Sequence, residues 1–147
     1  MLTALSLAIY RLINEIFIMG DDIDRQLFNQ FSLTVRQYHM LNWLDRRGPM
    51  GLSELAQLML CDKSNVTSIT RRLITAQLIE KLPHSDRRFT TVALTAAGKQ
   101  LHDEAEAALQ QSIEERFATL PDFMILHQQL LQVHSSLKDY LLHRPES

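Results

Sequence analysis

Residues 52–76, LSELAQLMLCDKSNVTSITRRLITA, decide the fold of this 147-residue chain. The first part of this stretch repeats apolar residues at helical spacing, which predicts a short helix capped by Ser53. Asp62 is then expected to cap a second helix that runs to about Ala76. Two short helices in tandem, separated by a few residues, are typical of a helix-turn-helix unit.

The neighbouring segments extend this unit. Thr34-Val-Arg-Gln37 has the form of a capping box, so a helix is expected to begin there and to end at Gly48-Pro49. Residues 78–83 and 89–94 have strand character, and the polar tip His84-Ser-Asp-Arg-Arg88 joins them. A helix-turn-helix followed by a β-hairpin is a winged helix-turn-helix.

Long helices are predicted at both ends, over residues 3–30, from Thr95 to about 120, and from 123 to about 143. The last one carries apolar residues at alternating spacings of three and four, which is typical of a helix that packs along another helix. We call these positions the C-terminal stripe: Phe123, Leu126, Leu130, Val133, Leu137 and Tyr140. Such a stripe can also simply cover the core of one small domain.

The three long helices present more apolar surface than the small winged lobe can cover, so we expect an obligate homodimer through both ends of the chain. Its dimer contacts are assigned to Leu126, Leu130, Val133, Leu137 and Tyr140. The expected fold is mainly α with a small β-hairpin wing (α+β). It is a single domain over 1–147, with the DNA-binding lobe at 34–95 and dimerisation helices at 1–31 and 96–147.

Composition supports this fold class and narrows the function. Apolar residues make up 46% and charged residues 22%, as in ordinary globular proteins, and only four glycines and four prolines disfavour an all-β fold. No uncharged apolar run reaches about 18 residues, so no membrane span or membrane partner is expected. The single cysteine, Cys61, excludes an internal disulfide and suits the cytoplasm.

Charge is concentrated in one stretch. The chain has a formal net charge of −2, whereas residues 62–88 hold six basic and three acidic side chains. One face of the helix expected at 62–76 has no carboxylate, and it consists of Ser64, Thr67, Ser68, Arg71 and Thr75. Such a face fits the DNA major groove, because serine, threonine and arginine hydrogen-bond base edges and phosphates. A solvated amphipathic helix is the alternative.

The wing tip adds cations to this surface. Arg88 is expected to enter the minor groove, with Asp86 orienting it through a charge-assisted hydrogen bond. Lys63, Arg72 and Arg87 are assigned to the DNA backbone. The alternative for the tip is a solvated turn with an internal ion pair.

Residues 32 to about 100 resemble the DNA-binding lobe of the multiple antibiotic resistance regulator (MarR) family. The matching strings are SLTVRQYHML, LSELAQLMLCDKSNVTSITRRL and IEKLPHSDRRFTTVALTAAGKQL. Within them, Asp86 and Arg88 form the Asp-x-Arg wing signature, and residues 94–98 form the Leu-Thr-x-x-Gly string. The sequence departs from the pattern at Gln77, where the family often has glycine, and at the Pro83-His84-Ser85 approach to the wing.

The resemblance implies a homodimeric transcriptional regulator, usually a repressor. Carried over by position, the residues that contact the major groove are Ser64, Asn65, Thr67, Ser68 and Arg71. Arg88 then enters the minor groove, and Asp86 orients it. The expected function is a ligand-responsive repressor that binds double-stranded DNA at a pseudo-palindromic operator. The alternative is a winged-helix protein-interaction or enzyme-dimerisation module without DNA readout.

Members of the family commonly bind small molecules between the dimer helices and the winged lobe. The resemblance therefore implies a small aromatic effector, with Tyr10, Phe31, His39 and Trp43 as candidates for an aromatic wall, although such residues are also ordinary core. A bound ligand would shift the population of dimers toward or away from the spacing that fits the operator.

Enzymatic, metal and redox functions find little support. The chain lacks a glycine-rich phosphate loop, a serine elbow and an HExxH motif, so no enzyme is expected. Its six histidines show no ligand spacing, so no metal or cofactor is expected, and we interpret them as surface or cap residues. Cys61 has no resolving cysteine within the chain, and burial as a small apolar residue is its expected role.

Overall fold

The computed structural model describes residues 1–83 and 89–143, and the chain divides into two compact units at residue 112. The elements in chain order are α1 (Leu2–Asn29), α2 (Val35–Arg47), β1 (Met50–Gly51), α3 (Leu52–Leu58), α4 (Lys63–Thr75), β2 (Ile79–Leu82), β3 (Thr91–Leu94), α5 (Ala96–Phe117) and α6 (Phe123–Leu142). The fold is mainly helical with one small antiparallel sheet, which confirms the expected fold class.

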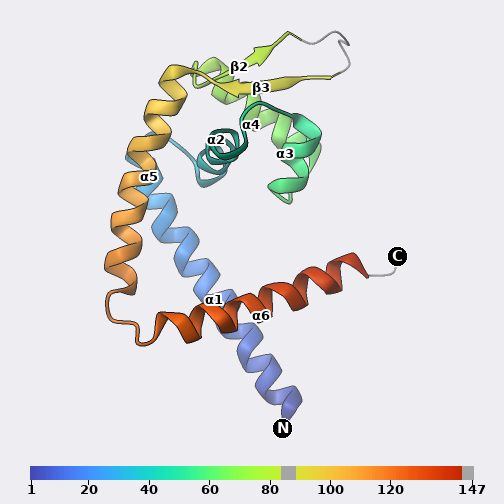
Figure 1. Cartoon of the computed structure of the whole chain (residues 1–147), viewed down its shortest axis with the longest axis vertical. Coiled ribbons are helices and arrows are strands. Elements are labelled where there is room, and N and C mark those ends of the chain that lie inside the picture. Colours follow the sequence, from blue (N-terminus) through green and yellow to red (C-terminus); the bar gives the residue numbers. More distant parts are fainter. Residues whose placement is uncertain (84–88, 144–147) are drawn as a thin grey trace. The chain divides into compact units, whose positions relative to one another are not determined.

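The sheet has three strands in the order β1-β3-β2, and both pairs are antiparallel. Val92 of β3 lies opposite Met50 on one side and Lys81 of β2 on the other. The sequence predicted only the β2–β3 hairpin, because a strand of two residues is too short to show an alternating pattern. In Figure 1 this sheet lies beside α2, α3 and α4, and together they form the winged lobe.

The core of the winged lobe lies where these helices meet the sheet. Its largest fully buried side chains are Phe28, Met40, Leu41, Leu55, Val66, Leu73, Ile79 and Val92. They come from α1, α2, α3, α4 and two strands, so one apolar cluster fixes α4 relative to its neighbours. Cys61 is partly buried and packs against this cluster, as expected.

The helix starts were predicted with mixed success. Thr34 forms the expected capping box, in which its hydroxyl accepts from the Gln37 amide at 3.1 Å and its own amide donates to the Gln37 side chain at 2.8 Å. The prediction for Ser53 is wrong, since the cap of α3 is Gly51, two residues earlier, and the helix begins at Leu52. Asp62 is the N-cap residue of α4, but its side chain makes no capping hydrogen bond.

A left-handed residue that is not glycine follows within three residues of the ends of α1, α3 and α4. Ser32, Leu60 and Gln77 have φ angles of 55°, 48° and 59°. After Gln77, the Leu78 amide donates to the Leu73 carbonyl at 2.9 Å, and this is the long hydrogen bond of a Schellman motif. The glycine that the family often has at Gln77 is therefore not required to turn the chain from α4 into β2.

The turn from α4 into β2 is tied to the start of α5. The Thr95 amide donates to the Leu78 carbonyl at 3.1 Å, and the Thr95 hydroxyl donates to the Gln77 carbonyl at 2.7 Å. The same hydroxyl accepts from the Gly98 amide at 3.0 Å, which confirms that Thr95 caps this helix. Gly98 lies so close to the strand that a Cβ there would be 1.8 Å from the Leu78 carbonyl oxygen.

Tyr38 of α2 joins α1, α2 and α5. Its ring stacks on Phe28 with centroids 4.1 Å apart and on His102 with centroids 5.8 Å apart. Its hydroxyl donates a hydrogen bond to Glu106. Burial, together with the Glu106 carboxylate, raises the pKa of Tyr38 well above its usual value of 10. The phenol therefore stays protonated and keeps donating at neutral pH.

We expect Tyr38→Phe to lower the free energy of unfolding by about 1–2 kcal/mol, because the stacked ring remains while one charge-assisted hydrogen bond is lost. Denaturant titration followed by circular dichroism measures this loss. Glu106→Gln keeps an acceptor for the Tyr38 hydroxyl, so this control should lose less. Equal stability of Tyr38→Phe and wild type would show that the hydrogen bond contributes nothing.

Candidate nucleic-acid interface

The exposed face of α4 is polar and carries no carboxylate. Val66, Thr70 and Leu73 anchor the opposite face in the core. The predicted contact residues Ser64, Thr67 and Arg71 are exposed, as is Thr75 one turn further on. Serine and threonine side chains are short, so their hydroxyl groups and the neighbouring arginine can approach base edges closely. No carboxylate on this face would repel the phosphates.

Two of these threonines have their hydroxyl hydrogens already engaged. The Thr67 hydroxyl donates to the Lys63 carbonyl at 2.8 Å, and the Thr75 hydroxyl donates to the Arg71 carbonyl at 2.9 Å. Their oxygens still have lone pairs that can accept from base amino groups. In this conformation the face therefore offers acceptors from threonine and donors from Arg71.

A groove of about 330 Å³ runs between α4 and the sheet. Thr67, Arg71 and Thr75 line it from α4, and Lys81 of β2 and Thr90 line it from the sheet side. Lys63, at the start of α4, lines a neighbouring hollow of about 320 Å³ with Phe89 and Thr90. The exposed side of α4 is thus continuous with cationic and hydroxyl groups of the wing strands.

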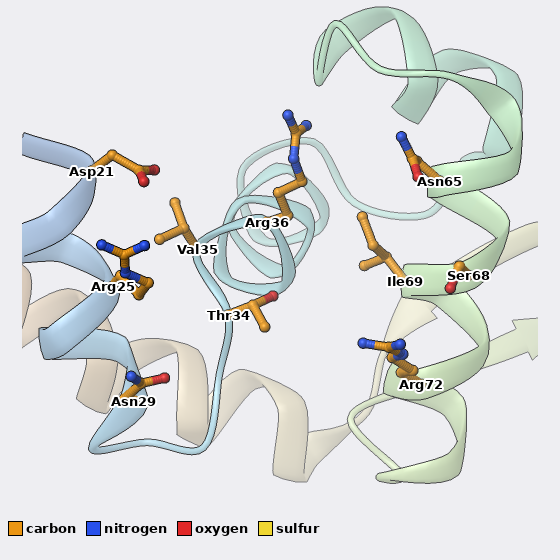
Figure 2. Close-up of a pocket in the computed structure, with 10 residues that line it drawn as sticks. All are labelled: Asp21, Arg25, Asn29, Thr34, Val35, Arg36, Asn65, Ser68, Ile69 and Arg72. Carbon is orange, nitrogen blue, oxygen red and sulfur yellow. The ribbon is translucent and has the colours of Figure 1, made fainter. Parts of the chain in front are cut away.

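The remaining α4 candidates lie on another side of the helix. Asn65, Ser68 and Arg72 line a cleft that α4 forms with α1 and α2 (Figure 2). The structure therefore divides the predicted contacts into an outer ridge of Ser64, Thr67 and Arg71 and a second row facing the cleft. The wing residues Asp86, Arg87 and Arg88 lie outside the described residues.

Comparison with known proteins agrees with this geometry. Residues 33–90, which include α2, α3, α4 and β2, match the MarR family. The HTH-type transcriptional regulator YsmB of Bacillus subtilis, itself uncharacterized, is 26% identical over 117 residues, covering 78% of this chain and 80% of YsmB. The winged lobe of this chain therefore matches the MarR family.

Solved structures show the same fold. The regulator BldR of Sulfolobus solfataricus has a TM-score of 0.79 at 20% identity, with 89% of this chain and 95% of BldR covered. A cysteine-to-serine mutant of Escherichia coli MarR, solved with operator DNA, has a TM-score of 0.76 at 20% identity, with 87% and 93% covered. The solved structures show the fold alone. The match of the winged lobe and the similarity to curated HTH-type transcriptional regulators identify this chain as an intracellular, DNA-binding transcriptional regulator and not an enzyme.

The four effector candidates do not form one wall. His39 and Trp43 of α2 line a hollow of about 280 Å³ together with Arg36, Leu58 and Met59. Phe31 packs against the core, and Tyr10 is 63% exposed in the first half of α1. The sequence suggested the aromatic residues but could not show that α3 supplies the other side of the hollow.

The interpretation of all six histidines as surface or cap residues is wrong for His102. Its side chain is 4% exposed, its Nε2 lies 3.3 Å from the Asn42 side-chain oxygen, and its Nδ1 lies 3.2 Å from Asp103.

Asp45, His102 and Asp103 are close enough together to share a metal ion. Lys99, however, lies 3.1 Å from Asp45 and 2.5 Å from Asp103, so an ammonium already compensates these carboxylates.

Lys99 and His102 both lower the pKa of the Asp103 carboxyl. Hydrogen bonds from Lys99 and then from His102 hold the pKa of Asp103 below its usual value of 3.8. The carboxylate therefore remains ionised at neutral pH. We interpret the group as a polar connection between α2 and α5 and not as a metal site.

The long helices expose most of their apolar residues. No residue of α6 is buried, and Leu130, Leu137 and Tyr140 are each more than half exposed. On α1, the apolar positions that indicated the helix are all exposed, namely Leu5, Ile9, Leu12, Ile13, Ile16 and Phe17. By length and composition alone, α1 could also cross a membrane, although no span was expected. Arg11 and Glu15 interrupt its apolar sequence.

Proposed function

We propose that this chain is a homodimeric, ligand-responsive repressor that acts in the cytoplasm on a pseudo-palindromic operator. The face of α4 carries the proposal, because its exposed residues are the types that contact base edges and its buried residues hold it rigidly against the core. Two such helices related by a two-fold axis would read half-sites about one helical turn apart.

Within this proposal, Ser64, Thr67 and Arg71 contact bases directly from the ridge. Asn65 and Ser68 reach the major groove from the side of the helix that faces the cleft, and Lys63 and Arg72 bind phosphates. Arg87 binds the backbone and Arg88 the minor groove, with Asp86 orienting it. The place of the first seven on α4, and the position of the last three in the sequence between the paired strands β2 and β3, support this assignment.

Dimerisation is supported by the exposed apolar residues of α1 and α6. A monomeric soluble protein rarely exposes contiguous apolar surface on this scale. A second copy would bury the C-terminal stripe, and two-fold symmetry would let the same positions meet on both protomers. A ligand response is supported by the hollow beside His39 and Trp43, where an aromatic effector would touch both α2 and α3. Tyr10 and Phe31 remain proposed effector contacts.

Arg71→Ala tests the DNA-contacting role of α4. Selection from a random duplex pool gives the preferred site, and we expect the variant to bind that site about 1–3 kcal/mol more weakly, with a smaller loss on random DNA. Arg46→Ala removes another exposed arginine, from α2, and should leave both affinities unchanged. Equal losses of Arg71→Ala on both DNAs would mean that Arg71 contacts only the backbone. If no duplex is enriched, the protein-interaction module is favoured.

A further inference from the structure

The hollow beside Lys63 adjoins the groove that α4 forms with the sheet. It holds about 320 Å³, and its walls come from β1, α3, the start of α4 and the chain that enters β3. We call it the Phe89 hollow, and its lining residues are Gly51, Leu52, Ser53, Lys63, Phe89, Thr90 and Thr91. Leu52 and Thr90 also line the groove beside Thr67 and Arg71, so the two depressions share a border.

Backbone hydrogen bonds hold the walls of the Phe89 hollow in place. Gly51 of β1 pairs with Thr91 of β3, and the Leu52 amide donates to the Thr90 carbonyl at 3.3 Å. These contacts fix the start of α3 against the strand that follows Phe89. A site whose shape is fixed in advance loses little conformational entropy when it binds a ligand.

The polar part of the lining suits a phosphate. Lys63 supplies one positive charge, and none of the described lining residues carries a carboxylate. Within residues 1–83 and 89–143, no ion pair is found for Lys63. The hydroxyls of Ser53 and Thr90 can donate to phosphate oxygens. Lysine, serine and threonine side chains are typical partners of the DNA backbone.

The apolar part of the lining is an aromatic ring at the surface. Phe89 is 62% exposed, and among the described large apolar side chains of residues 34–95 only Leu60 is also exposed. In DNA a deoxyribose adjoins every phosphate, and burial of a phenylalanine ring against its carbon atoms is favourable. The ring and the Lys63 ammonium therefore match the two halves of one backbone unit.

We propose that the Phe89 hollow holds one nucleotide of the operator backbone, with its phosphate on Lys63 and its deoxyribose against the Phe89 ring. This inference rests on the proposed function, in which α4 reads the major groove and Arg88 enters the minor groove. One DNA strand separates these grooves, so a protein that enters both must meet that strand in between. The Phe89 hollow borders α4 and the chain that follows the wing tip.

The first test separates the sugar contact from the phosphate contact by salt dependence. Fluorescence anisotropy measures binding to the selected duplex and to a random duplex between about 50 and 200 mM salt. Phe89→Ala should weaken binding to both duplexes by at least about tenfold and leave the salt slope unchanged, because a ring releases no counterion. Lys63→Gln should weaken both and lower the slope of log K against log salt by about 0.9 for each protomer bound.

Two control variants accompany this measurement. Phe89→Tyr keeps the ring and should bind within about twofold of the wild type. Leu60→Ala removes the other exposed apolar side chain, which does not line the hollow, and should leave both affinities unchanged. Thermal unfolding of Phe89→Ala should match the wild type, because most of the ring is exposed.

Three results of the first test would overturn the proposal. One is wild-type affinity of Phe89→Ala, and another is a loss confined to the selected duplex, which would assign Phe89 to a base. The third is a fall in the salt slope of Phe89→Ala as large as that of Lys63→Gln, since the ring would then only hold a cation in place.

The second test locates the phosphate. Each phosphate of the selected duplex is replaced in turn by a neutral methylphosphonate. One position in each half-site should weaken binding by the wild type at least about threefold and leave Lys63→Gln unaffected, because that variant has already lost the contact. Lys81→Gln removes a cation of the neighbouring groove and should still respond at this position. If every position affects Lys63→Gln and the wild type equally, Lys63 holds no phosphate and the proposal is wrong.

Failure of the proposed function gives a different result. In that case the wild type enriches no duplex, and the assignment of the Phe89 hollow falls with it. If the wild type selects a duplex while Phe89→Ala and Lys63→Gln bind as tightly as it does, only the assignment of the Phe89 hollow is overturned.

Discussion

Gly98→Ala is expected to destabilise the winged lobe by about 3 kcal/mol or more, at the upper end of the range for overpacking. The new Cβ would lie 1.8 Å from the Leu78 carbonyl oxygen and 2.8 Å from its carbon. Both are backbone atoms, so no side-chain rotation can relieve the clash. The start of α5 would have to move away from β2, which would stretch the hydrogen bond from the Thr95 amide to the Leu78 carbonyl.

Thermal unfolding followed by circular dichroism measures this effect, and a loss of about 3 kcal/mol corresponds to a fall in Tm of about 6–12 °C. Gly51→Ala is the matched control in the same lobe, because a Cβ there would lie at an ordinary 3.9 Å from the Thr90 carbonyl. We expect this control to lose at most about 1 kcal/mol, as for other replacements at an N-cap. Similar Tm values for the two variants would contradict the close approach at Gly98.

The role of Gly98 could not be derived from its own neighbourhood in the sequence. The resemblance placed it in the Leu-Thr-x-x-Gly string, but only the structure shows that the reason is contact with a backbone carbonyl twenty residues earlier. In contrast, the capping box at Thr34 was predictable, because both hydrogen bonds form between residues three apart. Interactions between residues close together in the sequence can therefore be predicted from it, whereas close approaches between elements far apart in the chain cannot.

The same distinction explains the other differences. Glycine is the usual signal for a helix end, but here Ser32, Leu60 and Gln77 take the left-handed conformation. Strand β1 has two residues and depends on pairing with β3, far along the chain. His102 looked like a surface residue, since nothing near it in the sequence indicates that Tyr38 stacks on its ring.

For the candidate interface, the helical spacing placed Thr67, Arg71 and Thr75 on the exposed face of α4, where the structure has them. Val66 and Leu73 are buried, and Thr67 and Arg71 are exposed. Sequence spacing could not show that α1 and α2 lie beside Ser68. The position of these two helices makes one part of the predicted DNA-contacting surface the wall of a cleft.

Replacing Leu130 and Leu137 together by lysine is expected to produce a monomer and to weaken operator binding by at least about 100-fold. Both side chains are more than half exposed in the single chain, so their replacement removes little intrachain packing. Two charges on the C-terminal stripe would remain unpaired in an apolar contact between protomers. A monomer engages one half-site only, and it loses the gain that comes from linking two binding events.

Light scattering after size exclusion measures the mass, and a mobility-shift titration on the selected duplex measures the affinity. Gln128→Lys places the same charge on α6 away from the stripe, and this control should remain dimeric and bind normally. The apolar surface of α6 extends beyond the stripe to Met124, Ile125 and Leu131, which are also at least half exposed. If the double variant stays dimeric while Leu131→Lys dissociates, the protomers meet through that other face of α6 and the assignment of the stripe is wrong.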